Sequence, residues 1–210
     1  MNIGIIGTGN MGSGLGKLWA GKGHKVLFGS RDPQKANTLA SSIGPNASGG
    51  TIADAAKFGE AVLLATPWAA TRDAINAAGS LVGKILIDCT NPLAPDYMSL
   101  VVGHTTSGAE EIAKWATGAK VVKAFNAVFA QVLHSGNPLF GSEPATIFYC
   151  GDDAQAKGIV AGLITELDFE AIDAGPLKNA RALEPLGELF VQLGYGLGMG
   201  TNIAVKVLRR

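Results

Sequence analysis

The chain has 210 residues, of which 47% are hydrophobic and 16% charged, and its 17 basic and 17 acidic side chains cancel to a formal net charge of +0. This length suits one large domain, or a main domain with a small annex, and the composition excludes a disordered chain or a polyelectrolyte. Balanced charge leaves no broad footprint for nucleic acid or for a membrane surface, so we expect a small-molecule partner. Glycine is enriched about twofold over its average share but lacks the period of collagen.

The cysteines and the N-terminal sequence bear on the cellular compartment. Cys89 and Cys150 lie far apart, and each ends a strand-like run, which favours buried reduced thiols over a disulfide or a metal site. The run 1–9 has no basic segment and no signal-peptide core, and no apolar stretch is long enough to span a membrane. We expect a cytoplasmic protein with no membrane anchor and no bound metal.

The N-terminal part alternates strand and helix. Residues 2–7 form a short apolar run that is typical of a buried parallel strand. Apolar side chains at helical spacing follow over 10–22. Residues 25–29 predict a second strand, and Asp32 and Pro33 predict the N-cap and the first position of the next helix.

The same alternation continues to residue 173. Five more runs predict strands, and helical patterns separate most of them: 61–66, 84–89, 119–125, 145–150 and 169–173. This order predicts an α/β fold of the Rossmann type, with a doubly wound, mostly parallel sheet covered by helices on both faces. We expect residues 1–175 to form this dinucleotide-binding domain and 176–210 to form a small C-terminal helical cap without a core of its own.

A glycine motif follows the first strand. It matches G-x-G-x-x-G at the point where strand passes into helix, and it comprises Gly7, Thr8, Gly9, Asn10, Met11 and Gly12. Gly7 permits a tight turn, Gly9 lets a pyrophosphate approach the backbone, and Gly12 lets the helix pack closely on the strand. Unpaired N–H groups at the helix start then face the phosphates. The motif predicts a dinucleotide site.

The end of the second strand indicates which dinucleotide binds. An NAD site usually has an acidic residue there, whereas an NADP site needs donors and positive charge for a 2′-phosphate. Ser30 supplies a hydroxyl, and the Arg31 guanidinium can bind phosphate in bidentate fashion. Lys35 adds charge if its helix turns it inward, whereas Asp32 is expected to cap that helix. These residues predict NADP, with Gly29 leaving room beside the phosphate.

Two later strand ends are expected to border the same ligand, because ligands of open α/β sheets bind at the carboxyl ends of strands. Thr66, Pro67 and Trp68 end one strand, and Asn91 follows the next. Trp68 would line the ribose or the nicotinamide, or would pack as a core aromatic. Cys89 has no histidine near it in sequence and follows an aspartate, so we interpret it as a packing thiol.

Candidates for acid or base catalysis are few. His24, His104 and His134 are scattered, and together with Asp88 and Glu184 they form no triad and no metal-ligand spacing. We therefore assign no catalytic residue. Hydride transfer between two redox cofactors needs the alignment of two rings and little protein acid–base chemistry, so this absence favours that reaction class.

Later motifs make the sequence resemble one family. They are Gly-Ser-Arg at 29–31, Thr-Pro-Trp at 66–68, Val-Val-Lys-Ala-Phe-Asn at 121–126, Cys-Gly-Asp-Asp at 150–153 and Asp-Ala-Gly-Pro-Leu-Lys-Asn-Ala-Arg at 173–181. Over nearly its whole length the chain resembles F420-dependent NADP oxidoreductases. It is similar also to the cytosolic oxidoreductase domain of STEAP-type ferric reductases. The resemblance implies that Thr8, Ser30 and Arg31 hold NADP and that the backbone around Ala124 contacts the nicotinamide carboxamide.

The resemblance also implies a second redox ring, a deazaflavin or a flavin, stacked on the nicotinamide in a cleft closed by the C-terminal helices. Asn126, Val128 and the turn 176–179 would lie on that side. Archaeal members of the family carry a histidine where this chain has Asn126, and the Ala-Phe-Asn form resembles STEAP-like and bacterial relatives. The electron partner therefore stays open among the deazaflavin, a flavin and an unrelated small carbonyl or imine.

These observations predict an NADP-dependent oxidoreductase that transfers hydride between NADP(H) and coenzyme F420 or a flavin such as FMN or FAD. Two alternatives remain: an NADP-binding sensor or regulatory module without turnover, and a small imine or carbonyl reductase like pyrroline-carboxylate reductases. The late glycines and the apolar C-terminal run are compatible with a homodimer, and equally with a buried helix within one chain.

Overall fold

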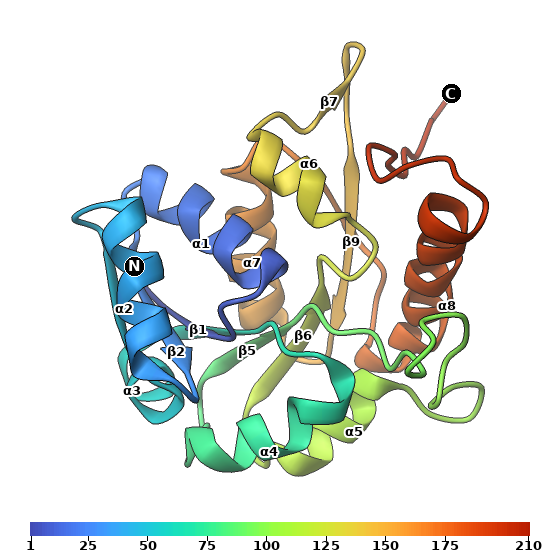
Figure 1. The fold of residues 1–210 in the computed structure, drawn as a ribbon. Coiled ribbons are helices and arrows are strands. Elements are labelled where there is room, and N and C mark those ends of the chain that lie inside the picture. Colours follow the sequence, from blue (N-terminus) through green and yellow to red (C-terminus); the bar gives the residue numbers. More distant parts are fainter.

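The computed structural model describes residues 1–210 and is built on one eight-stranded sheet (Figure 1). The strand order is β10-β9-β6-β5-β4-β1-β2-β3, and all neighbours are parallel except β6 and β9. The strands are β1 (Asn2–Ile6), β2 (Lys25–Ser30), β3 (Ala47–Thr51), β4 (Ala61–Leu64), β5 (Ile85–Asp88), β6 (Lys120–Ala124), β9 (Thr146–Gly151) and β10 (Glu170–Asp173). The order reverses between β1 and β4, as in a doubly wound Rossmann-type fold. The predicted fold class is confirmed.

Helices cover both faces of the sheet. In Figure 1, α1, α6 and α7 lie on one side and α4 and α5 on the other. The helices are α1 (Asn10–Gly21), α2 (Pro33–Ile43), α3 (Ile52–Phe58), α4 (Trp68–Ala78), α5 (Gly108–Trp115), α6 (Ala130–Ser135), α7 (Ala154–Thr165) and α8 (Ala180–Val191). Two clusters of buried apolar residues fill the two interfaces. Ile5 belongs to one cluster and Ile6 to the other, so β1 is a continuous apolar run.

The edge strand β3 is missing from the sequence prediction. Its residues, ASGGT, include two glycines and no large apolar side chain, which is poor strand composition. Close packing requires the first of these glycines, because a Cβ on Gly49 would lie 2.4 Å from the backbone nitrogen of Asn37 in α2. Parallel pairing with β2 and direct contact with α2 therefore form this strand, rather than side-chain propensity. The strands that were predicted begin and end within two residues of the prediction.

The region after β10 is only partly helical. A 3-10 turn η1 (Leu177–Asn179) leads into α8, and a π turn η2 (Gln192–Gly196) follows that helix. Residues 197–210 contain no helix, and within them the Val205 carbonyl accepts a hydrogen bond from the Thr146 N–H at 2.8 Å. The chain contains no helix that is both long and apolar enough to cross a membrane.

The late glycine cluster has a structural explanation. Gly194 packs against the ring of Phe129, where a Cβ would lie 2.6 Å from the nearest ring carbon. Gly198 and Gly200 adopt φ values of +72° and +77°, which favour glycine. These glycines let the chain turn back sharply after α8. A short separate hairpin, β7 (Leu139–Phe140) with β8 (Glu143–Pro144), precedes β9.

Candidate active site

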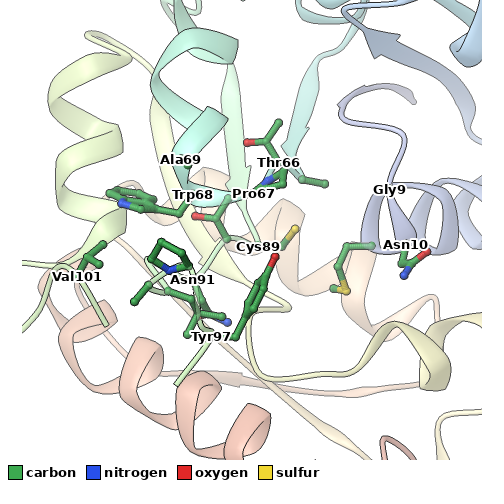
Figure 2. A pocket seen from close by; sticks show the side chains of 16 residues that line it. Gly9, Asn10, Thr66, Pro67, Trp68, Ala69, Cys89, Asn91, Tyr97 and Val101 are labelled. Carbon is green, nitrogen blue, oxygen red and sulfur yellow. The ribbon is translucent and has the colours of Figure 1, made fainter. Parts of the chain in front are cut away.

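A groove made of three adjoining hollows runs along the carboxyl ends of the parallel strands. The phosphate hollow, about 490 Å³, is lined by residues that include Gly7, Thr8, Gly9, Ser30, Arg31, Lys35, Thr66 and Pro67. The main cavity, about 650 Å³, is lined by residues that include Gly9, Asn10, Met11, Thr66, Pro67, Trp68, Cys89, Thr90, Asn91 and Tyr97 (Figure 2). The aromatic hollow, about 250 Å³, is lined by residues that include Asn10, Met11, Asn91, Asn126, Val128, Phe129, Phe190 and Tyr195. Shared lining residues join each hollow to the next.

The glycine turn has the geometry that the motif predicts. Gly7 has φ +118°, and a Cβ there would lie 2.3 Å from the Ala65 carbonyl oxygen. A Cβ on Gly12 would lie 2.3 Å from the Gly7 carbonyl oxygen, so α1 packs directly on the turn. Gly9, by contrast, has no atom within 4 Å of its Cβ position. It is the N-cap of α1 and has no side chain, so the first N–H groups of α1 are free to bind an anion.

The cations at the end of β2 are unpaired. Arg31 and Lys35 are exposed and make no ion pair or side-chain hydrogen bond within the chain, and both line the phosphate hollow. Ser30 Oγ accepts a hydrogen bond from the Asp32 N–H at 3.2 Å. Asp32 caps α2 by accepting from the Gln34 N–H at 3.0 Å, as predicted. The carboxylate therefore has a structural partner, and the two positive side chains are available to a ligand.

One expectation at this strand end is wrong. Gly29 does not serve to leave room for a phosphate, because its Cβ position is already occupied by the protein. A Cβ there would lie 2.8 Å from the Ala55 side chain and 2.9 Å from the Ile52 backbone. Glycine is needed at this position because α3 packs directly on β2, a contact between segments that a local reading of the strand could not show.

Thr66, Pro67 and Trp68 form one wall of the main cavity, as Figure 2 shows. Thr66 Oγ1 lies 3.0 Å from Thr71 Oγ1, which ties the end of β4 to α4. The Trp68 ring packs on Trp115 with centroids 5.3 Å apart. Trp68 is half-buried, so it packs against Trp115 of α5 and also lines the cavity, while its contact with the ribose or the nicotinamide stays a prediction.

Asn91 and Asn126 form a pair of amides where the main cavity meets the aromatic hollow. Asn91 Nδ2 donates to the Asn126 carbonyl at 2.7 Å, and Asn126 Nδ2 donates to Asn91 Oδ1 at 3.0 Å and to the Leu183 carbonyl at 2.7 Å. Phe125, just before Asn126, has φ +62°, an uncommon value that turns the chain at the end of β6. Ala124 is buried in β6 and lines none of the three hollows.

Sequence reasoning missed a buried ion cluster beneath the main cavity. Lys123 Nζ lies 2.9 Å from Asp88 Oδ2 and 2.9 Å from Glu184 Oε1, and these side chains are at most 1% exposed. Burial alone would lower the pKa of Lys123, but the two carboxylates outweigh it and raise the pKa to about 12. Glu184 also accepts from the Gly108 and Ala109 N–H groups at the start of α5. The sequence signal for this cluster is a lysine within the otherwise apolar run of β6. In the sheet, Lys123 pairs in register with Asp88 of β5.

The site contains few groups that could transfer a proton. Neither the main cavity nor the aromatic hollow is lined by a carboxylate, a histidine, a lysine or an arginine. Cys89 lines both, but burial raises the pKa of its thiol to about 12, and the thiol donates to the Leu64 carbonyl at 3.3 Å. Cys150 is buried and has a similarly raised pKa. His24 lies 2.6 Å from Glu166, outside the groove.

The turn 176–179 does not lie beside the groove, contrary to expectation. None of its residues lines the three hollows, and Leu177 instead accepts from the Cys150 thiol at 3.7 Å. The reason is that β9 is antiparallel to β6 and β10 is parallel to β9. The chain therefore leaves β10 in the direction away from the carboxyl ends of the parallel strands, where the groove lies. It is α8 that returns to the groove, where it contributes Gly187 and Phe190.

A doubly wound sheet with an uncapped glycine turn and a groove leading away from it defines the class of Rossmann-type dinucleotide-binding proteins. A family model described as NADP oxidoreductase, coenzyme F420-dependent, matches residues 2–92. The F420-dependent NADP reductase of Methanocaldococcus jannaschii is 33% identical over 223 residues, which cover 98% of both chains. The chain belongs to the F420-dependent NADP oxidoreductase family, and it is an NADP-dependent oxidoreductase.

Two further proteins are similar to this chain over most of its length. A crystal structure assigned as an F420-dependent NADP reductase of Arthrobacter sp. FB24 superposes with a TM-score of 0.89 at 32% identity, covering 99% of both chains. Metalloreductase STEAP3 of Rattus norvegicus is 31% identical over 184 residues, which cover 88% of this chain and 36% of STEAP3. The chain thus spans about a third of that metalloreductase, so that protein's own activity does not carry over directly.

Proposed function

We propose that the protein transfers hydride between NADP(H) and coenzyme F420, with a flavin as the alternative acceptor. The observation that carries this proposal is the pairing of a groove for a dinucleotide with a roomy cavity that no carboxylate, histidine, lysine or arginine lines, so that its only titratable side chains are the Tyr97 phenol and the buried Cys89 thiol. Reduction of a carbonyl or an imine usually needs a positioned proton donor, whereas transfer between two rings depends on alignment. The archaeal and Arthrobacter relatives carry the same acceptor in their names.

The residues present fit an NADP molecule laid along the groove. The open position at Gly9 and the free N–H groups of α1 would take the pyrophosphate. Arg31, Lys35 and Ser30 would hold the 2′-phosphate, because the two cations have no partner within the chain. The other proposed contacts are Gly7, Thr8, Asn10, Met11, Gly12, Thr66, Pro67, Trp68, Asn91, Ala124 and Asn126. Ala124 would act through its backbone only.

The bound nicotinamide supplies a hydride donor or acceptor carbon. The protein's part is to hold that ring and the acceptor ring face to face and to keep water away. Leu93, Ala94 and Pro95 are apolar and line the main cavity together with Cys89. Phe129 and Tyr195 pack edge to face with centroids 5.6 Å apart and line the aromatic hollow. These walls suit flat rings better than a small flexible substrate.

An anaerobic absorbance assay tests the acceptor. Purified protein with NADPH should reduce F420, and FMN and FAD are measured beside it as the alternative rings. A panel of ketones and cyclic imines tests the reductase alternative. Oxidation of NADPH by the ketone or imine panel alone would overturn the proposal. Tight NADPH binding with no acceptor reduced would instead select a sensor module.

We also propose a homodimer in which α8 and the segment after it meet a second copy. Leu189, Tyr195, Leu197 and Met199 are 48–73% exposed there, which is a large apolar surface for a single chain. The region 176–210 would then act as a cap on the domain 1–175, in a reducing cytoplasm that suits two unpaired thiols. Light scattering after size exclusion should give twice the monomer mass, and Leu197→Asp with Met199→Asp should restore the monomer.

A further inference from the structure

Thr90 has a buried hydroxyl with no partner. The residue follows β5, lines the main cavity and is 4% exposed. Its Oγ1 is the one buried side-chain nitrogen or oxygen in the chain that makes no hydrogen bond. Buried hydroxyls in folded proteins nearly always find a partner, because leaving one unmade costs stability. An unpaired hydroxyl in the lining of a binding cavity therefore points to a partner that arrives with a ligand.

The backbone of Thr90 is fixed on both sides by the buried ion cluster. Its N–H donates to Asp88 Oδ1 at 2.8 Å, and its carbonyl accepts from Lys123 Nζ at 2.5 Å. Lys123 in turn is held by Asp88 and by Glu184 from α8. Because both peptide groups are tied, the backbone of Thr90 is held in place at the end of β5, and only rotation about χ1 changes where the hydroxyl lies. The ion cluster therefore fixes the position of the Thr90 backbone, from which the side chain extends.

The neighbouring polar groups at the same strand end, unlike the Thr90 hydroxyl, already have hydrogen-bond partners within the protein. The Cys89 thiol donates to the Leu64 carbonyl, and the Asn91 amide donates to the Asn126 carbonyl. Beyond them the wall is apolar, with Leu93, Ala94 and Pro95. A ligand that places a polar edge against this end of the cavity thus meets one buried side-chain group that makes no hydrogen bond at all, the Thr90 hydroxyl, which can both donate and accept.

We infer that the Thr90 hydroxyl hydrogen-bonds an amide edge of the ring system in the main cavity, with Lys123 positioning it. This inference rests on the proposed function, because both rings of the proposed redox pair carry such an edge. One is the carboxamide of nicotinamide and the other is the pyrimidine-dione edge of a deazaflavin or flavin. The shared chemistry is an amide carbonyl or N–H beside a flat ring.

Thr90→Val and Thr90→Ser test the inference, since Val keeps the shape without the hydroxyl and Ser keeps the hydroxyl. Thr71→Val is the matched control, because Thr71 is equally buried but bonds to Thr66 and to the Pro67 carbonyl. In ligand-free protein we expect Thr71→Val to lower the melting temperature and Thr90→Val to leave it unchanged or raise it. A hydroxyl with a merely structural role would lower it in both variants.

Binding is then measured without turnover. NADPH is titrated by nicotinamide fluorescence, and oxidised F420 is titrated into the complex with NADP⁺. Thr90→Val should weaken one of the two by about tenfold, and Thr90→Ser should restore it to within about threefold. A loss for NADPH assigns the carboxamide, and a loss for F420 assigns the acceptor edge. Both affinities within twofold of the parent would overturn the inference, whereas failure of the parent protein to bind F420 would count against the proposed function and leave the NADPH arm valid.

Discussion

Replacement of Lys123 by methionine should strongly destabilise the protein, because it leaves two buried carboxylates without a cation. Lys123 and Asp88 are 0% exposed and Glu184 is 1% exposed, so water cannot take the place of the ammonium group. Removing one partner of such a buried ion pair costs about 3–5 kcal/mol. For a chain of this length, that loss corresponds to a fall in melting temperature of roughly 6–20 °C.

The pH dependence of stability follows from the raised pKa of Lys123. The two carboxylates raise the pKa of this ammonium group from 10.5 to about 12 in the folded protein. Stability tied to a raised pKa is complete below the unfolded pKa and is lost as the pH rises through the folded pKa. The stability advantage of the parent over Lys123→Met should therefore be fully present at about pH 8 and should shrink above about pH 10.5.

Urea unfolding followed by circular dichroism at several pH values measures both effects. Lys22→Met is the matched control, since the Lys22–Asp168 pair spans 3.3 Å with side chains 45% and 73% exposed. It should cost less than about 1 kcal/mol. The reasoning is refuted if Lys123→Met costs no more than Lys22→Met, or if the difference in stability between the parent and Lys123→Met grows as the pH rises above about 10.5.

Three further outcomes follow from the groove and from the two buried thiols. Arg31→Ala should weaken NADPH by about 10- to 100-fold and leave NADH within about twofold in fluorescence titrations; equal losses would contradict the 2′-phosphate assignment. Gly12→Ala should weaken NADPH binding and lower the melting temperature, because its Cβ would meet the Gly7 carbonyl at 2.3 Å, whereas Gly21→Ala, with no atom within 4 Å, should change neither. The thiols of Cys89 and Cys150, each with a pKa of about 12, should resist a disulfide reagent at pH 8 until urea exposes them, and rapid reaction of native protein would argue against their burial.

Features set by short stretches of chain could be predicted from the sequence. The apolar run of β1, the glycine turn and the Asp32 cap each depend on neighbours within a few residues. The glycine turn lies between a strand and a helix, as the motif requires. Gly7 packs closely on the Ala65 carbonyl and Gly12 on the Gly7 carbonyl, so neither position has room for a side chain. Local propensity and local hydrogen bonding determine these elements, so their sequence signals are strong.

Features set by contacts between distant segments could not be predicted. β3 forms because Gly49 fits against α2, and Gly29 is required by α3 rather than by a ligand. The partners of Lys123 come from β5 and α8, 35 and 61 residues away along the chain. Because β9 is antiparallel to β6, the turn 176–179 lies away from the groove and α8 reaches it instead. Strand register and direction create these neighbours, and a single sequence carries no local signal for them.

The most direct test of hydride transfer from NADPH to F420 follows the transferred hydrogen as deuterium. NADPH labelled with deuterium at C4 of the nicotinamide, on each face in turn, is incubated with F420 and the protein without oxygen. The reduced F420 is then analysed by mass spectrometry. Hydride transfer between two rings held face to face predicts that the deuterium from one of the two labelled faces is recovered in the reduced F420. Reduced F420 that carries no deuterium from either face, or no reduction at all, would contradict the account.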